Sequence, residues 1–165
     1  SSLNPRMTVS DIIGEPLDVH HLYKTKQERH DRILELMDHV GLNSEHAARY
    51  AHEFSGGQRQ RMAIARAVVK KPEIYLFDDS FSALDVKTDK TLRMRLRESM
   101  GDSTMLIVAQ RVGSILDADR ILVMEDGQIV GRGKHRELLH TCPLYREIAE
   151  LQLGEEEVKH ELECV

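Results

Sequence analysis

The sequence contains no tryptophan, only 4% aromatic residues and two cysteines among its 165 residues. So few aromatic rings argue against a surface that stacks nucleic-acid bases. Cys142 and Cys164 lie far apart, which favours reduced thiols in a cytosolic protein over a disulfide framework or a metal site. No run approaches about 18 consecutive apolar residues, and the N-terminus lacks a secretory pattern, so neither a membrane span nor a signal is predicted.

The sequence also lacks a run of basic residues. Its formal net charge is −5, and charged residues make up 31% of the chain. This balance argues against nucleic acid or anionic lipid as a partner. Apolar residues make up 41%, which is typical of a soluble globular domain.

Apolar periodicity divides the chain into alternating helices and strands. We expect helices over residues 28–40, 44–52, 55–69, 86–100, 112–117, 134–140 and 143–153. We expect buried strands over 74–77 and 105–109, and a hairpin formed by 121–124 and 128–130 around an Asp-Gly turn. This order predicts an α/β protein with a largely parallel sheet, followed by a polar tail over 154–165 that is disordered or loosely helical.

A glycine pair opens one of these helices in the segment Ser55–Gln58. Glycines let a ligand approach the backbone closely, and the first turn of a helix has N–H groups without intrahelical partners. The Ser55 hydroxyl adds a donor, so the segment can bind a phosphate. The alternative is a turn that merely starts a helix, because short glycine motifs recur widely.

Carboxylates follow the first expected strand directly, at Asp78 and Asp79. Ligands of α/β sheets bind at the carboxyl ends of parallel strands. One carboxylate there can hold Mg²⁺, usually through water, and the other can orient or deprotonate an attacking water. Asp85 follows a few residues later, and the second strand ends at Gln110, where a polar side chain could meet a γ-phosphate. The alternative is a pair of solvated acids.

Together these motifs resemble the nucleotide-binding domain of ATP-binding-cassette (ABC) transporters, over nearly the whole chain. The resemblance implies an incomplete P-loop NTPase-like ABC ATPase domain. The segments that carry it are Phe54–Arg61 (signature), Ile74–Asp79 (Walker B), Ser82–Asp85 (D-loop), Thr104–Arg111 (switch segment) and Asp126–Leu139 (C-terminal hairpin and helix).

Two parts of the chain resemble different branches of this family. Residues 1–67 are similar to the ATPase subunits of oligopeptide and dipeptide importers, especially over Ser1–Val9. Residues 68–153 are similar to the degenerate half of heterodimeric multidrug exporters, especially over Asp78–Thr88 and Cys142–Ile148. We interpret the chain as an engineered or recombined chimera that begins just after the family's Gln-containing loop; an unusual single lineage is the alternative.

The chain departs from the family at three places. Asp79 replaces the hydrolytic Glu, and a carboxylate misplaced by about 1 Å costs on the order of a hundredfold in rate. Gln110 replaces the switch His and cannot become cationic. No Gly-x-x-x-x-Gly-Lys-Ser/Thr phosphate loop (Walker A) occurs in the sequence. We therefore expect the isolated chain to bind Mg-ATP weakly and to be inactive as an ATPase.

The resemblance also implies a role for each site residue. Asp78 would help to hold Mg²⁺, Asp79 would stand at the base position and Gln110 would sense the γ-phosphate. Ser55, Gly56, Gly57 and Gln58 would contact the ATP of a second nucleotide-binding domain, and Asp85 would contribute to cofactor binding. A bulky acid at Gly57 is expected to leave the fold largely intact while preventing ATP-driven pairing.

The division implied by these motifs is a helical subdomain over 1–70, a catalytic half over 71–153 and the tail over 154–165. The expected function is part of a transporter ATP-binding subunit, cytoplasmic and held at the inner membrane face by a transmembrane partner. The alternative is a catalytically silent half-domain that acts as a folding or interaction module. A soluble ATPase of DNA repair or translation is disfavoured because the sequence lacks a basic surface.

Overall fold

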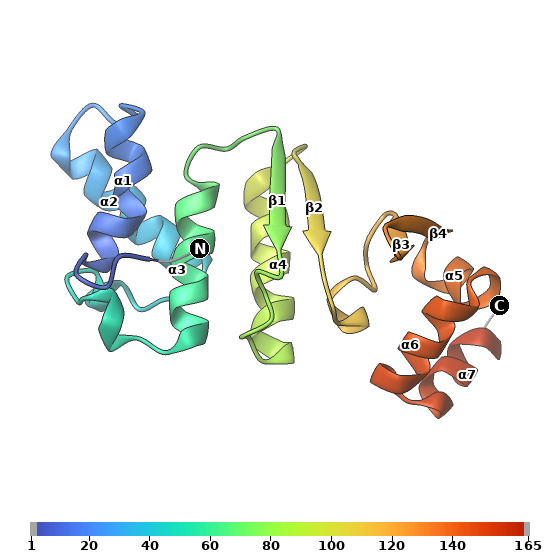
Figure 1. The fold of residues 1–165 in the computed structure, drawn as a ribbon. Coiled ribbons are helices and arrows are strands. Elements are labelled where there is room, and N and C mark those ends of the chain that lie inside the picture. Colours follow the sequence, from blue (N-terminus) through green and yellow to red (C-terminus); the bar gives the residue numbers. More distant parts are fainter. Residues whose placement is uncertain (1–2, 164–165) are drawn as a thin grey trace. The chain divides into compact units, whose positions relative to one another are not determined.

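A computed structural model describes residues 3–163 of the chain (Figure 1), and these divide into two compact units between Leu106 and Ile107. Ser1, Ser2 and Cys164, which carried sequence expectations, lie outside the described residues. The unit boundary falls within a strand rather than at residue 70, so the division by motif stays a prediction. None of the helices over residues 3–163 is long and apolar enough to cross a membrane.

The first unit begins with three packed helices, and two short 3₁₀ turns lie between the second and the third. Thr8 begins the first of them with a capping box, because its hydroxyl accepts from the Asp11 N–H at 3.1 Å while the Asp11 carboxylate accepts from the Thr8 N–H at 3.2 Å. Val9, Ile12, Ile13 and other apolar residues at helical spacing are almost fully buried. The elements are α1 (Val9–Val19), α2 (Lys26–His39), η1 (Ser44–His46), η2 (Ala51–Glu53) and α3 (Gly56–Val68).

The rest of the first unit consists of two strands and one helix. The second of these strands contains Leu106, where the unit ends. Strand β1 (Ile74–Asp78) pairs with β2 (Thr104–Val108), and both arrows run the same way in Figure 1. Between them lies α4 (Val86–Met100). Burial alternates along β1, so Tyr75 and Phe77 are buried while Ile74 and Leu76 are about two-thirds exposed. The strand pair therefore has one covered face and one open face.

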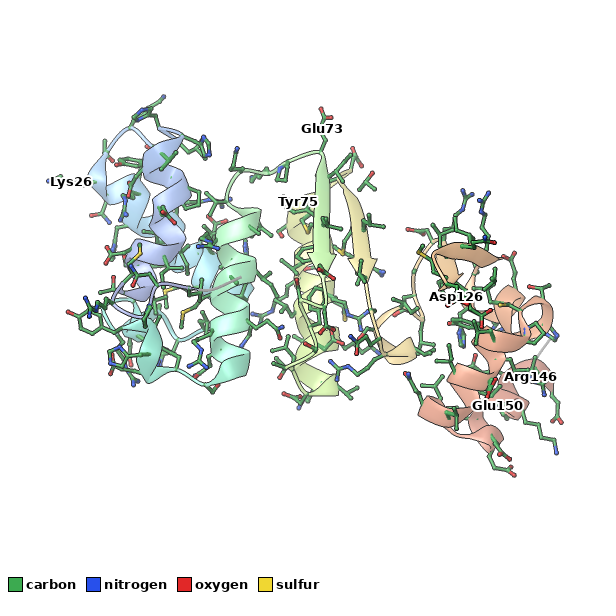
Figure 2. The ribbon with its side chains drawn as sticks, in the orientation of Figure 1. Lys26, Glu73, Tyr75, Asp126, Arg146 and Glu150 are labelled. Atoms are coloured by element: carbon green, nitrogen blue, oxygen red, sulfur yellow. The ribbon has the colours of Figure 1, made fainter. Side chains whose placement is uncertain are left out.

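The second unit is a hairpin packed with helices. Asp126 and Gly127 both have positive φ, at 48° and 77°, as a two-residue type I′ hairpin turn requires. Figure 2 labels Asp126 on this turn, and Arg146 and Glu150 on the helix Pro143–Leu153, where the Arg146 Nε lies 2.8 Å from a Glu150 carboxylate oxygen. The elements are η3 (Val112–Ser114), β3 (Ile121–Glu125), β4 (Gln128–Gly133), α5 (His135–Thr141), α6 (Pro143–Leu153) and α7 (Glu155–Glu163).

A buried polar group joins the three helices of this unit. His135 on α5 is 6% exposed; its Nδ1 lies 2.8 Å from the Tyr145 hydroxyl on α6, and its Nε2 lies 2.8 Å from the Glu161 carboxylate on α7. Burial, followed by the charge of Glu161, raises the pKa of Tyr145 to about 12. The three side chains thus form one hydrogen-bonded group across three helices.

The sequence expectation is confirmed for the α/β composition, but three details differ. The helix expected over 44–52 is two separate 3₁₀ turns, and that over 112–117 is a single turn, η3. The expected solvated tail instead contains α7, because Val158 is buried in the core of the second unit and Leu162 packs against it. Over residues 3–163 the strands form two two-stranded sheets, and because β3–β4 is antiparallel, parallel pairing in this part of the chain is confined to β1–β2.

Candidate functional site

The signature turn is held by a capping box at the start of α3. The Ser55 hydroxyl accepts from the Gln58 N–H at 3.3 Å, and the Ser55 N–H donates to the Gln58 side-chain oxygen at 2.9 Å. The next N–H groups, at Gly56 and Gly57, have no carbonyl of the helix to bind. A helix N-terminus with such groups attracts an anion. The four residues expected to bind a phosphate are therefore brought together.

The two glycines of this turn have different surroundings. A Cβ added to Gly56 would meet nothing within 4 Å, whereas one added to Gly57 would lie 3.0 Å from the Ala83 carbonyl oxygen and 3.4 Å from a Leu84 methyl group. Gly56 is open to a ligand, and Gly57 is packed against the D-loop. This corrects the expectation that Gly57 is a surface position whose side chain can be enlarged at little cost to the fold.

The aspartate pair lies at the end of β1, with both side chains exposed. Asp79 has a left-handed backbone, with φ of 48°, which Asp tolerates better than most residues. Its carbonyl oxygen accepts from the Ser82 hydroxyl at 3.0 Å and the Ser82 N–H at 3.4 Å. These bonds fix the backbone turn that carries Asp79 directly after the end of the strand at Asp78.

The aspartate pair fits a Mg²⁺ ion that is completed by phosphate and water, since this ion is usually held by only one or two carboxylates. Within residues 3–163, no group of three or more His, Cys, Asp or Glu side chains gathers to hold a metal ion. The described residues therefore do not form a metal site made of protein ligands alone.

Asp85 of the D-loop caps α4. Its carboxylate accepts from the Thr88 N–H at 2.9 Å. Hydrogen bonds from the Thr88 side chain and backbone hold the pKa of Asp85 below its usual range. The structure thus gives Asp85 a structural task, and its expected contact with a cofactor stays a prediction.

Gln110 belongs to the second unit. Its side chain is exposed, and its carbonyl oxygen accepts from the Gln152 side chain of α6 at 2.9 Å. The same Gln152 accepts from the Val112 N–H at 2.8 Å. The backbone after β2 is therefore held by α6, while the expected grouping of Gln110 with the two aspartates stays a prediction.

Sequence reasoning missed the role of two polar residues on α3. Gln60 binds the loop after β1, with contacts to Asp79 and Ala83. Arg61 donates to the Val40 and Gly41 carbonyls at the end of α2, at 3.3 and 2.5 Å. Both residues lie within the segment that resembles the signature. Their position on the half-buried side of α3 is the one signal that could have predicted these contacts.

Comparison with known proteins follows the same motifs. A family model described as "ABC transporter" matches residues 1–82. The oligopeptide transport ATP-binding protein OppF of Bacillus subtilis (strain 168) is 50% identical over 133 residues, which are 79% of this chain and 44% of that protein. The chain thus spans less than half the length of this relative. The likeness to peptide-transport subunits was expected over residues 1–67 alone. Because this match covers 133 residues, the likeness extends beyond that first part of the chain.

Solved structures show the same fold. A bacterial Atm1-family ABC exporter with ATP bound has a TM-score of 0.76 and 29% identity, over 94% of this chain and 27% of that one. The dimeric ATP-binding cassette MJ0796, bound to ADP and Pi, has a TM-score of 0.74 and 29% identity, over 81% of this chain and 59% of that one. The signature turn, the strand-end aspartates and these likenesses agree: the chain belongs to the ABC transporter family.

Proposed function

We propose that the chain is the part of an ABC transporter ATP-binding subunit that presents the signature turn to a second cassette. The observation that carries the proposal is the start of α3, where Ser55 and Gln58 fix a turn whose Gly56 is open on its outer side. Free N–H groups at a helix N-terminus bind phosphate. The cassette MJ0796, which is similar to this chain, is dimeric and was bound to ADP and Pi.

In this proposal the ligands are ATP and Mg²⁺. Asp78 helps to hold Mg²⁺, Asp79 occupies the base position, and Gln110 senses the γ-phosphate. The signature residues contact the nucleotide of the partner cassette, and Asp85 of the D-loop contributes to cofactor binding. Bound Mg²⁺ would neutralise charge on the phosphates, while the chain's own residues would orient the nucleotide and its attacking water.

The whole protein would use ATP binding and hydrolysis to drive transport through a transmembrane partner, at the cytoplasmic face of a membrane. The likeness to OppF, named as an oligopeptide transport protein, supports a peptide as the transported substrate. The likeness to the structure of an Atm1-family exporter supports export as the direction of transport. The nucleotide chemistry proposed for this chain is the same for both directions.

The test is ATP-dependent association with a hydrolysis-deficient ABC cassette, measured by sedimentation with and without Mg-ATP. We expect the unmodified chain to associate only with Mg-ATP, and Gly56→Asp to lose this association, because it places a negative charge where a phosphate would bind. Gly56→Ala is the matched control, since a Cβ at Gly56 meets nothing within 4 Å.

Two results would contradict the proposal. One is equal association of the unmodified and Gly56→Asp chains, which would make the turn a structural corner. The other is no association of the unmodified chain, which would favour a catalytically silent module.

A further inference from the structure

Gln60 reaches from the signature helix to the loop that carries Asp79. It lies three residues after Gly57 and therefore on the same side of α3. Its Nε2 donates to the Asp79 carbonyl at 3.3 Å, and its Oε1 accepts from the Ala83 N–H at 3.0 Å. A primary amide offers a donor and an acceptor, so one side chain satisfies both backbone groups.

The backbone that Gln60 binds includes Asp79, whose left-handed conformation Asp tolerates better than most residues but still adopts at a cost. A residue other than glycine at φ of 48°, as at Asp79, persists only when its surroundings over-determine it. Ser82 contributes two bonds to the same carbonyl, but these come from within the loop. The bonds from Gln60 come from another element and fix the loop relative to α3.

Close packing accompanies these hydrogen bonds. Gly57 leaves only enough room for the Ala83 carbonyl, which would lie 3.0 Å from an added Cβ. Phe81 and Leu84 of the same loop are 3% and 6% exposed. The loop therefore meets α3 through a polar contact at Gln60 and a steric contact at Gly57, one turn apart.

We propose that Gln60 is a positioning residue that makes the signature turn and the loop carrying Asp79 move as one body. The inference rests on the proposed function, in which the signature turn contacts the partner's nucleotide and Asp79 serves the nucleotide of its own chain. A displacement of α3 caused by the partner then displaces the Asp79 carbonyl and the Ala83 amide with it. Gln60 acts through the backbone and does not itself touch the nucleotide.

Amide hydrogen exchange of Ala83, measured by NMR on the chain itself, tests the tie between helix and loop. Gln60→Met keeps the length of the side chain but removes both hydrogen bonds, so we expect Ala83 to exchange about five to tenfold faster. Gln60→Glu keeps an acceptor for the Ala83 N–H and should restore much of the protection. Gln27→Met on α2, where Gln27 binds the exposed Asp31, is the matched control and should leave Ala83 unchanged.

Unchanged exchange of Ala83 in Gln60→Met would overturn the inference. So would equal acceleration of amides in the middle of α3, such as Ala65, because the variant would then have loosened the helix rather than the tie.

Addition of the hydrolysis-deficient cassette with Mg-ATP separates positioning from mere stability. In the unmodified chain we expect association to change the exchange of Ala83. In Gln60→Met we expect association to persist while Ala83 no longer responds. Association without any response of Ala83 in the unmodified chain would overturn the positioning role. No association at all would contradict the proposed function, while the exchange of Ala83 in the free chain would still decide the tie.

Discussion

Each unit contains a group of three packed helices, and the contacts inside one group differ in kind from those inside the other. In the α1–α3 group, apolar residues fill the centre and the main ion pair lies at the edge. Arg29 on α2 binds both carboxylate oxygens of Asp18 on α1, at 2.6 and 2.7 Å, with side chains 22% and 43% exposed. In the α5–α7 group, His135 and Tyr145 place a polar contact inside.

The difference shows where each group is vulnerable. A buried polar group without its partner costs more than a surface ion pair gains. Both groups should therefore respond to lost apolar volume, and the second should in addition respond to the loss of one buried hydrogen-bond partner. Three substitutions test this contrast, in order of expected effect.

The largest effect should come from Ile13→Ala in α1. Ile13 is completely buried, so its truncation leaves a cavity that we expect to destabilise the α1–α3 group by about 2–5 kcal/mol. Residue-resolved amide exchange measures this for each unit separately. Val19→Ala, at a side chain that is 65% exposed on the same helix, is the control and should change little. A similar small cost for both would mean that the apolar centre does not hold this group.

An intermediate effect should come from Tyr145→Phe in α6. Loss of the hydroxyl leaves the His135 ring nitrogen without this contact, and we expect a cost of about 1–3 kcal/mol to the α5–α7 group near neutral pH. Amide exchange of α5–α7 measures the cost. A neutral result would show that the polar contact can be replaced by simple packing.

The same substitution has an expected pH dependence. Because folding raises the pKa of Tyr145 from 10 to about 12, the protonated phenol is favoured in the folded state. Its contribution to the free energy of unfolding is full below pH 10 and is lost as the pH rises toward about 12. Urea unfolding followed by circular dichroism should show a shallower alkaline loss for Tyr145→Phe. The remaining loss includes Tyr75, whose pKa is also raised by burial. Identical alkaline profiles would contradict this.

The smallest effect should come from Asp18→Asn in α1. The Arg29 hydrogen bond holds the pKa of Asp18 below its usual range, against the opposing effect of burial. A lowered folded pKa contributes stability above the ordinary value of 3.8 that is lost as the pH falls through the folded value. Because the pair is partly exposed, we expect less than about 1 kcal/mol. Unfolding compared at pH 7 and near pH 3 should show a weaker acid loss for Asp18→Asn; an equal loss would place the acid sensitivity elsewhere.

The sequence predicts features that depend on local pattern. The helix over 143–153 has the expected bounds because Pro143 suits its first turn and Gly154 its end. The signature turn was likewise expected, since its glycines and capping residues are neighbours in the chain. The tail was expected to be disordered or loosely helical, and the helical alternative is the one observed; the packing of Val158 and Leu162 was missed because three successive glutamates obscure their helical spacing.

Contacts between distant segments could not be predicted in this way. Nothing near Gly14 in the sequence indicates that a Cβ there would clash with the Arg29 guanidinium. The bond between Gln60 and Ala83 spans 23 residues and depends on how α3 packs against the loop. The left-handed backbone of Asp79 carries no local sequence signal as strong as a glycine would give.

The alternating burial along β1 has a practical meaning for anyone who handles this chain in solution. Parallel strands are ordinarily covered on both faces, yet Ile74 and Leu76 stay about two-thirds exposed and Leu106 about half. An apolar strand surface of this kind is wetted poorly and adheres to others like it. We therefore expect this face to favour association between copies of the chain, and Leu76→Lys to weaken that association.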